Sequence, residues 1–483
     1  MSASGFIAKV VVAGGGITAW SAAAALKKRI PILDVQLIET PPAADALADR
    51  IISTLPSVCA FHHDIGLTEA DSIAAVASAL RLGTLFEGWA NDQPDYVHSY
   101  GACGAPVGVV PFHQLWLRER AASALPEFDR FCPAGELARS GRQSQVASQP
   151  VGLQLTITRY AEMMRAYAQH VGVAARTATI ADVELRADDG FIEALVLPHG
   201  ERVTADLFVD CTGPGSMFQQ RLDTPFEDWS GWLPCDRVLL KETEADATTE
   251  RLDRVAAFSA GWRWTASSPL RGSRGVVYSS AHAQPDEAAR EIGGAEDPIV
   301  IRQGRRRDSW VRNCVAIGDA AVTVEPLEWT NLHLVHSQLD RLVALMPGRD
   351  CAAIELAEYN RECGAEADRV RDFLCLHYVC SARSEPFWRE ARSITPPPSL
   401  ERTLSLFRER GRLPYYQEET FTRDSWLTVL LGLGVRPQRI DPLADLVSTQ
   451  EAAQAFAAMR QSLQSFTLPA AGKLPELNPH GIR

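Results

Sequence analysis

The sequence predicts an α/β fold, in which a Rossmann-type nucleotide-binding core is followed by a mostly helical module. Three observations predict this fold. The chain opens with a strand, a glycine turn, a helix and a second strand; a buried strand late in the chain ends at Gly318-Asp319; and the pattern becomes mainly helical after Leu332. We therefore expect a nucleotide-binding domain with an inserted sheet region over residues 1–340, a helical substrate module over 341–467 and a loose tail over 468–483.

The opening pattern is a complete βαβ unit. The β-branched apolar run Lys9–Ala13 is typical of a strand that is buried on both faces. A glycine turn follows it, and the Ala-rich stretch Thr18–Arg29 predicts a helix. The run Val35–Ile38 predicts the second strand, which ends at Glu39.

The glycine turn of this unit has the spacing of a dinucleotide-binding fingerprint, Gly14-x-Gly16-x-x-Ala19. Gly14 permits the tight turn, Gly16 lets a pyrophosphate approach the backbone, and Ala19 keeps helix and strand close. The helix N-terminus offers free N–H groups to the phosphates, and Glu39 lies where an acid accepts ribose hydroxyls. The alternative is an empty Rossmann scaffold. The cofactor residues predicted in this unit are Gly14, Gly15, Gly16, Ile17, Thr18, Ala19 and Glu39.

The signals that mark helix and strand ends are weaker in the rest of the chain. We expect a helix over Ile65–Trp89, where Ala-rich turns dominate, and a glycine-rich loop over Tyr100–Val110. Alternating strands are expected between Gln154 and Asp210, and further strands over Val276–Ser279 and Val315–Ile317.

Two later motifs favour FAD over NAD as the dinucleotide. The strand Val315–Ile317 stops at Gly318-Asp319, and the pattern Asp-x-x-Val-Asp-Cys-Thr-Gly spans Asp206 to Gly213. Both resemble the paired secondary motifs of flavoprotein monooxygenases, in which the late Gly-Asp contacts FAD. The expected core is therefore of the flavoprotein monooxygenase type.

Composition excludes several classes of protein. The formal charge is −12, from 48 basic and 60 acidic side chains, which argues against a partner that is nucleic acid or an anionic membrane. No apolar run approaches the ~20 residues that span a bilayer, and no signal pattern opens the chain, so we expect a cytoplasmic location. The 10 cysteines include no CxxC pair, so we predict no metal and expect all ten to be reduced thiols.

Several ordered patterns resemble those of the flavin-dependent tryptophan halogenase family. Gly14–Trp20 is similar to its GGGTAGW motif, Gly261–Trp264 to the start of its WxWxIP signature, and Glu325–Glu328 to its EPLE segment. Three further segments resemble family patterns in the same order, namely Ser53–Pro56, Leu82–Trp89 and Ser425–Val435. The resemblance extends over nearly the whole chain.

This resemblance implies an activity. FAD, supplied as FADH2 by a separate flavin reductase, would react with oxygen and with chloride or bromide. The resulting hypohalous acid would pass through a short dry tunnel to a small aromatic substrate, usually an indole, and halogenate it by electrophilic substitution. The family also suggests a homodimer.

The resemblance assigns roles to residues of this chain. Arg81 stands at the position of the family's catalytic lysine, and Glu328 at that of its catalytic glutamate. Thr330 and Asn331 stand where halide is held, while His98, Tyr100 and Trp426 are expected to contact the substrate. Gly318, Asp319 and Leu327 complete the expected FAD contacts.

The chain departs from the family at several of these positions. Arginine is effectively always protonated, so Arg81 could donate hydrogen bonds to hypohalous acid but not form a haloamine. Arg50-Ile51-Ile52 replaces a glycine–glutamate strap, Trp329 replaces a serine, and the tryptophan signature loses its Ile and Pro. Two alternatives to halogenation therefore remain: an FAD-binding homologue that does not halogenate, and a flavin monooxygenase that hydroxylates.

Overall fold

A six-stranded sheet forms the centre of the nucleotide-binding core. The computed structural model describes residues 5–68, 79–91, 93–122, 125–141, 148–244, 251–294 and 297–467. The sheet has the order β19-β20-β11-β1-β2-β7, and all neighbours pair in parallel except β19 with β20. Its strands are β19 (Trp310–Val311), β20 (Cys314–Ala316), β11 (Leu207–Cys211), β1 (Lys9–Gly14), β2 (Asp34–Glu39) and β7 (Ala174–Thr177).

The order of this sheet places a crevice at the carboxyl ends of β1 and β11. The chain continues from β1 to β2 on one side and returns later to β11 on the other, so the strand order reverses there. Ligands of open α/β sheets bind at such a reversal point. The predicted strands at Lys9–Ala13, Val35–Ile38 and Val315–Ile317 are confirmed to within one residue at each end.

Helix α1 (Gly16–Arg29) begins directly after the glycine turn, two residues before the predicted start. Its alanine-rich face is buried and packs against α6 (Ile157–His170) and α9 (Asn331–Ala344). The small side chains let these helices approach closely, which fixes the N-terminus of α1 at the crevice.

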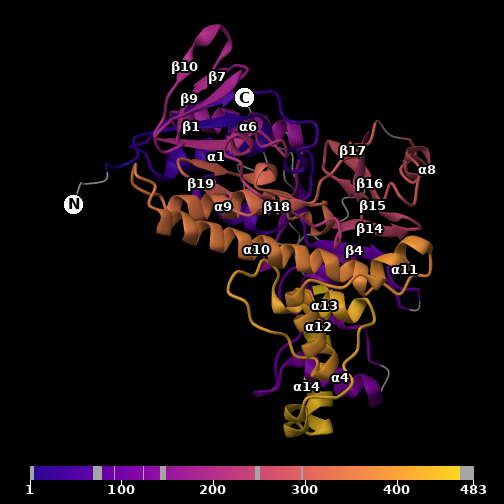
Figure 1. Cartoon of the computed structure of the whole chain (residues 1–483). Helices are drawn as coiled ribbons and strands as arrows, with labels where there is room; N and C mark the ends of the chain where they lie inside the picture. The colour runs from indigo at the N-terminus through magenta and orange to yellow at the C-terminus, as the bar shows by residue number, and fades with distance from the viewer. Residues whose placement is uncertain are drawn as a thin grey trace, which may run out of the picture.

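A seven-stranded sheet lies beside the core (Figure 1). Its strand β15 carries the two signature tryptophans, Trp262 and Trp264, which are buried. Its order is β17-β13-β16-β15-β14-β4-β5, antiparallel except for β14 with β4. Its strands are β17 (Ile299–Val300), β13 (Arg237–Glu244), β16 (Arg271–Tyr278), β15 (Gly261–Ser267), β14 (Leu252–Phe258), β4 (Gly83–Glu87) and β5 (Tyr96–Ser99). The strand predicted over Val276–Ser279 is the end of β16.

Three smaller sheets and several short helices connect these layers. The small sheets are β10-β9-β8, β12-β18-β21 and β3-β6. Their strands are β3 (Ala79–Arg81), β6 (Gly152–Gln154), β8 (Asp182–Leu185), β9 (Ile192–Val196), β10 (Arg202–Val203), β12 (Phe226–Asp228), β18 (Gly304–Arg306) and β21 (Val322–Thr323); the short helices are α2 (Ser57–Asp64), α7 (Met217–Arg221) and α8 (Pro285–Arg290).

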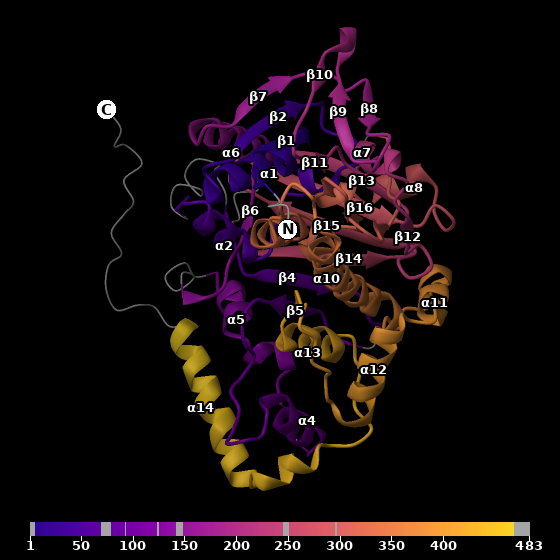
Figure 2. The same ribbon diagram turned by 60° about the vertical axis from the view of Figure 1, so that its left-hand side comes forward.

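The chain after Leu332 is mainly helical, as predicted. The long helix α10 (Ala353–Val379) runs beneath the sheets, with helical segments on its other side (Figures 1 and 2). These segments are α11 (Pro386–Ser393), α12 (Pro398–Arg410), α13 (Arg423–Gly432) and α14 (Thr449–Thr467), joined by α4 (Phe112–Ala122) and α5 (Pro133–Arg139) from the first half of the chain. Among the described helices, none combines the length and apolar character that spanning a bilayer requires.

One secondary-structure prediction is wrong and another is confirmed only in part. The stretch Ile65–Trp89 is not a helix, because α2 ends at Asp64 and β3 and β4 follow; residues 69–78 lie outside the described part of the chain. The described part that forms β4, Gly83–Glu87, pairs with β14 and β5. The strands expected between Gln154 and Asp210 are interrupted by α6, whose buried face repeats at Tyr160, Met164 and Ala168.

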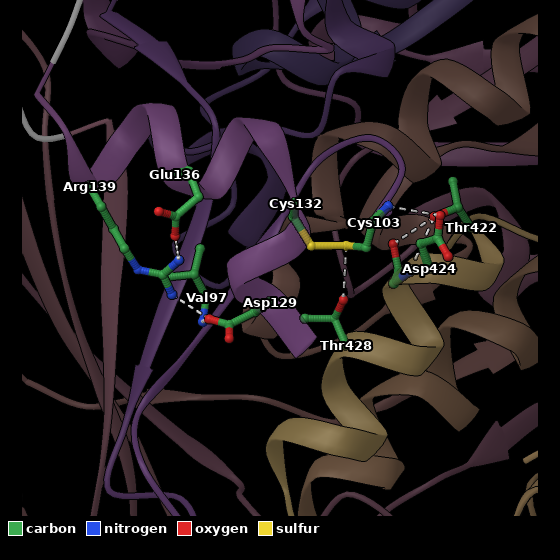
Figure 3. The surroundings of a disulfide bond; sticks show 10 residues. Val97, Cys103, Asp129, Cys132, Glu136, Arg139, Thr422, Asp424 and Thr428 are labelled. Atoms are coloured by element: carbon green, nitrogen blue, oxygen red, sulfur yellow. Dashed lines mark hydrogen bonds and ion pairs between the residues drawn. A yellow bond between two sulfur atoms is a disulfide. The ribbon is translucent and has the colours of Figure 1, made fainter. Parts of the chain in front are cut away.

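The expectation of ten reduced thiols is also wrong. Cys103 and Cys132 form a disulfide across a sequence separation of 29 residues (Figure 3). It joins the glycine-rich loop after β5 to the start of α5, and Cys103 N–H also donates to Asp424 on α13. The spacing of the two cysteines matches no motif, so only the folded proximity of these segments reveals the bond. The predicted tail, 468–483, lies outside the described residues.

Candidate active site

Three glycine turns converge at the carboxyl ends of β1, β11 and β20. They carry Gly16, Gly213 and Gly318, each with a positive φ that favours glycine. A Cβ added to Gly318 would lie 2.9 Å from Thr18 Cγ2, so the late Gly-Asp motif lies directly against the first turn. The fold thus brings together residues that are about 300 positions apart in the sequence, as the flavoprotein prediction requires.

Glu39 lies at the rim of this crevice, at the end of β2 and in register with Gly14. Its Oε2 accepts hydrogen bonds from Arg165 at 2.8 Å and from Thr177 at 3.0 Å. Of the other predicted cofactor residues, Ile17, Ala19 and Leu327 are buried in the apolar cores. Their side chains can therefore shape the crevice but not hydrogen-bond within it.

Asp319 is buried below the crevice and accepts a hydrogen bond from Ala48 N–H at 2.9 Å. Burial, with a smaller contribution from the nearby Asp49, raises the pKa of its carboxyl to about 8, against the hydrogen bond from Ala48 N–H. The late motif therefore holds the segment Leu47–Asp49 over the crevice.

Asp49 is a residue of this site that the sequence analysis missed. Its Oδ1 accepts hydrogen bonds from Thr18 N–H at 2.9 Å and Thr18 Oγ1 at 3.1 Å, at the N-terminus of α1. The only sequence signal was an acid directly after the apolar pair Leu47-Ala48. The backbone cradle fits a pyrophosphate, but in this structure a carboxylate occupies its anion-binding position.

Arg81, at the end of β3, is fully buried and forms an ion pair with Asp253 on β14. Its Nη1 donates to Tyr100 and, at 3.1 Å, to Thr54 O, and its Nη2 donates to Thr84. Burial lowers the pKa of the guanidinium, and Asp253 opposes that effect, so Arg81 remains charged.

Asp253 also escaped the sequence analysis. It shares the inward face of β14 with Val255 two residues later, so an acid on an apolar face was the available signal. Its Oδ1 accepts a hydrogen bond from Gln154 Nε2 at 2.6 Å. Asp253 therefore fixes the position of the guanidinium.

Glu328 lies on a strained turn between two histidines. His98 Nδ1–H donates to its carboxylate at 2.8 Å, and His377 Nε2 lies 3.2 Å from it. Burial alone would raise its pKa, but His98 and His377 lower the pKa to about 2, so Glu328 is a carboxylate at neutral pH. Glu328 and Trp329 have φ of 63° and 62°, a conformation that costs non-glycine residues energy and is frequent at functional sites.

The predicted halide residues follow this turn at the N-terminus of α9. Thr330 Oγ1 and Asn331 Oδ1 are buried without a hydrogen-bond partner among the described residues. Asn331 Nδ2 donates to Val324 O at 2.9 Å, which ties the turn to the strand before it. The Thr330 hydroxyl can donate a hydrogen bond and so fits a small anion at this helix N-terminus, whereas Asn331 Oδ1 can only accept one.

The predicted substrate residues fall into two groups. Tyr100 accepts from Arg81 and donates to Thr54 O, whereas His98 has Phe373 and Phe421 as ring neighbours at 5.7 and 6.3 Å. Trp426 packs edge-on against Phe373 at 4.9 Å. Trp426 and Phe421 also line a cavity of about 320 Å³, together with Tyr415, Tyr416 and Glu419.

Arg81, Glu328, His98 and Trp329 form one enclosed cluster. Their exposed fractions are 1, 2, 3 and 1%, and the guanidinium carbon lies 5.4 Å from the Trp329 ring centroid. Electrostatic effects are stronger in such a water-free site than at the surface. The cluster thus combines a fixed cation with a carboxylate that can accept a proton.

Comparisons with known proteins agree with these motifs. The sequence profile of the family described as tryptophan halogenase matches residues 9–449. The chain is 28% identical over 501 residues to tryptophan 6-halogenase SttH of Streptomyces toxytricini, with 94% of each chain covered. It is 27% identical to tryptophan 7-halogenase RebH of Lentzea aerocolonigenes, with 96% of this chain and 98% of RebH covered.

Solved structures extend the agreement to the fold. The structure is similar to BrvH, a flavin-dependent halogenase from Brevundimonas sp. BAL3, with a TM-score of 0.89, 34% identity and coverage of 96% of this chain and 97% of BrvH. It is similar to Xcc4156, a flavin-dependent halogenase from Xanthomonas campestris, with a TM-score of 0.90, 33% identity and 96% of each chain covered.

Proposed function

The chain belongs to the tryptophan halogenase family, and from this membership we propose that it is an FAD-dependent halogenase acting on an indole-like aromatic ring. One observation carries the proposal. The carboxylate of Glu328 is held between His98 and His377 in the same buried cluster as the Arg81 guanidinium. Electrophilic substitution on a ring needs a positive charge beside the oxidant and a carboxylate that accepts the ring proton.

The cofactor chemistry would come from FAD. Bound FAD, reduced by a separate flavin reductase, would supply the electrophilic halogen together with oxygen and chloride or bromide. The turn Gly14–Thr18 would face its pyrophosphate and Glu39 its ribose. The halide would lie beside Thr330, whose unpaired buried hydroxyl can donate to it, and beside the backbone of Asn331 at the N-terminus of α9.

The aromatic substrate would lie between His98 and the cavity lined by Phe421 and Trp426. The carbon–halogen bond forms as the halogen–oxygen bond of hypohalous acid breaks and its oxygen leaves as water. The carbon–hydrogen bond then breaks, and the carboxylate of Glu328 takes the proton. Arg81 would hold the oxidant by charge and hydrogen bonding, because its guanidinium stays protonated and cannot form a haloamine.

The experiment supplies purified protein with FAD, a flavin reductase, NADH, oxygen and bromide, and a panel of indoles. Mass spectrometry should detect products in which bromine replaces one hydrogen. The absence of any halogenated product from protein that binds FAD would instead support a homologue that does not halogenate. Hydroxylated products, or NADPH oxidation without added reductase, would support a monooxygenase.

The proposal includes two assembly features. A separate flavin reductase is needed as a partner because the sequence offers no second, NADPH-type fingerprint. A homodimer is proposed from the family, and size-exclusion chromatography with light scattering would measure it.

A further inference from the structure

The segment Leu47–Asp49 closes the crevice at which the glycine turns converge. It is anchored from below by Asp319, which accepts the hydrogen bond of Ala48 N–H. Ala43, which precedes this segment, also packs closely against one of the glycine turns: a Cβ added to Gly213 would lie 2.7 Å from Ala43 Cβ. The same segment is in contact with α1 and α9.

The carboxylate of Asp49 occupies the point at which a phosphate group would meet the helix. A Cβ added to Gly16 would lie 2.5 Å from Asp49 Cγ and 2.7 Å from each of its carboxylate oxygens. The same carboxylate accepts from both the N–H and the Oγ1 of Thr18. Glycine at position 16 normally leaves this space for a pyrophosphate. The Asp49 carboxylate and a pyrophosphate would therefore compete for the same hydrogen-bond donors.

We propose that Asp49 is a built-in competitor of the flavin nucleotide: its carboxylate occupies the phosphate position at the N-terminus of α1 and must leave before FAD binds. This inference rests on the proposed function for the identity of the cofactor. It assigns Asp49 to the control of cofactor uptake rather than to catalysis.

The charges around Asp49 support exchange rather than a permanent cap. Two further acids, Asp45 and Asp319, act on the same crevice, and burial raises the pKa of Asp49 to about 6 against the hydrogen bonds from Thr18. Arg50 is the cation nearest in sequence, but it is exposed. A carboxylate in this setting is less stable than one that faces bound cations.

Asp49 also has space into which it can move. A cavity of about 690 Å³ is lined by Asp49 together with the cations Arg50, Lys241 and Arg271 and the acid Glu242. A rotation of the Asp49 side chain toward these cations would free the donors of Thr18 without unfolding the segment. Opening the phosphate position therefore requires a rearrangement of the Asp49 side chain alone.

The test titrates full-length wild type, Asp49→Ala and Asp49→Asn with oxidised FAD and follows flavin fluorescence. Asp45→Ala is the matched control, because it removes the same charge four residues earlier, just before the segment Leu47–Asp49. We expect Asp49→Ala to lower the Kd for FAD by about tenfold, as removal of an anion from a helix N-terminus allows. Asp45→Ala should lower the Kd clearly less than Asp49→Ala does, because Asp45 acts on the crevice only through its charge and accepts no hydrogen bond from Thr18.

ADP serves as a second probe, because it carries the pyrophosphate without the flavin ring and should also bind more tightly to Asp49→Ala. Circular dichroism verifies that each variant is folded, and Asp49→Asn, which keeps the volume, serves if the alanine variant is not. An unchanged or higher Kd for FAD in a folded variant would overturn the inference while leaving the halogenase proposal intact. If neither wild type nor the variants bound FAD, both proposals would be wrong.

Discussion

Arg81 and Asp253 form an ion pair from which water is excluded, with exposed fractions of 1 and 0%. A buried charge that loses its partner cannot regain its hydration, so breaking the pair costs more than the pair contributes. The guanidinium also donates to Tyr100, Thr84 and Thr54 O, so its position is fixed from several sides.

We predict that Asp253→Asn lowers the free energy of unfolding by about 3–5 kcal/mol, because Arg81 is left without a counter-charge. Urea denaturation followed by tryptophan fluorescence measures this loss. The double variant Arg81→Met/Asp253→Leu should regain most of it. A single variant as stable as wild type would show that the pair is not buried in solution.

Glu328 is the residue on which the proposed chemistry depends. Replacing it by glutamine keeps its volume and backbone conformation but removes the group that accepts the ring proton. We predict that Glu328→Gln lowers the rate of halogenation by about 10²–10⁴-fold, the usual contribution of a general base. Product formation is measured by mass spectrometry, and the Kd for FAD should stay unchanged. A variant with undiminished rate would remove Glu328 from the mechanism.

At the scale of elements, the disulfide joins two segments, and hydrogen bonds connect a third to them. Cys103 belongs to the loop that follows Tyr100, Cys132 immediately precedes α5, and Asp424 and Thr428 of α13 contact Cys103 (Figure 3). The loop that carries Tyr100 is therefore fastened to the helical module that carries Trp426. A cross-link of this kind stabilises chiefly by restricting the unfolded chain.

We predict that reduction with a phosphine lowers the free energy of unfolding by about 2–4 kcal/mol. The transition is measured by urea denaturation with and without reductant. The variant Cys103→Ser/Cys132→Ser should no longer respond to the reductant, which separates this bond from effects on the free thiols. Identical transitions of wild type in both conditions would contradict the prediction.

The elements also show which parts of the molecule sequence reasoning can reach. The first βαβ unit was predicted correctly because its signals are local: a β-branched run, a glycine turn and an alanine-rich helix. The strand β4 was missed although its partner β5 is close in sequence; its other partner, β14, lies about 170 residues later, and pairing rather than propensity decides its conformation. Long-range pairing leaves little trace in a single sequence.

The site follows the same rule. Arg81 and Glu328 were located by motif, and the structure places both in one buried cluster. Asp253, His377 and Asp49 could not be assigned, because each acts on a partner that is distant in sequence. The aromatic neighbours of His98 likewise come from α10 and from the loop before α13, rather than from the motif that contains Tyr100.

At the scale of the whole molecule, buried acids give stability a definite pH dependence. Burial raises the pKa of Asp319 to about 8 and that of Glu325 to about 7, so the folded protein binds protons there that the unfolded chain has lost. The stability from these groups is complete below their unfolded pKa values and is lost as pH rises through 7 and 8. Burial lowers the pKa of His62 and of His113 to about 4, which costs stability as pH falls below about 6.5.

We therefore predict that the stability of the cofactor-free protein falls as pH rises from about 6.5 to about 8, by up to about 1.4 kcal/mol per pH unit for each acid. Urea denaturation across this range measures it. Asp319→Asn, which needs no proton, should make the decline shallower. A stability that rises over this interval would show that these carboxyls are not buried in the folded state.

Helix α10 has a consequence for how this protein could have diverged from its relatives. Its 27 residues form a rod about 40 Å long. Two residues of α10 make contacts with α9 and the turn before it: Glu366 contacts His333 and His377 contacts Glu328. They are 11 positions apart, which is about three helical turns, so both lie on one face of α10. One residue gained or lost between them would rotate His377 by about 100° away from Glu328. Evolution could lengthen the surface loops freely, whereas the number of residues in this stretch is as constrained as their identity.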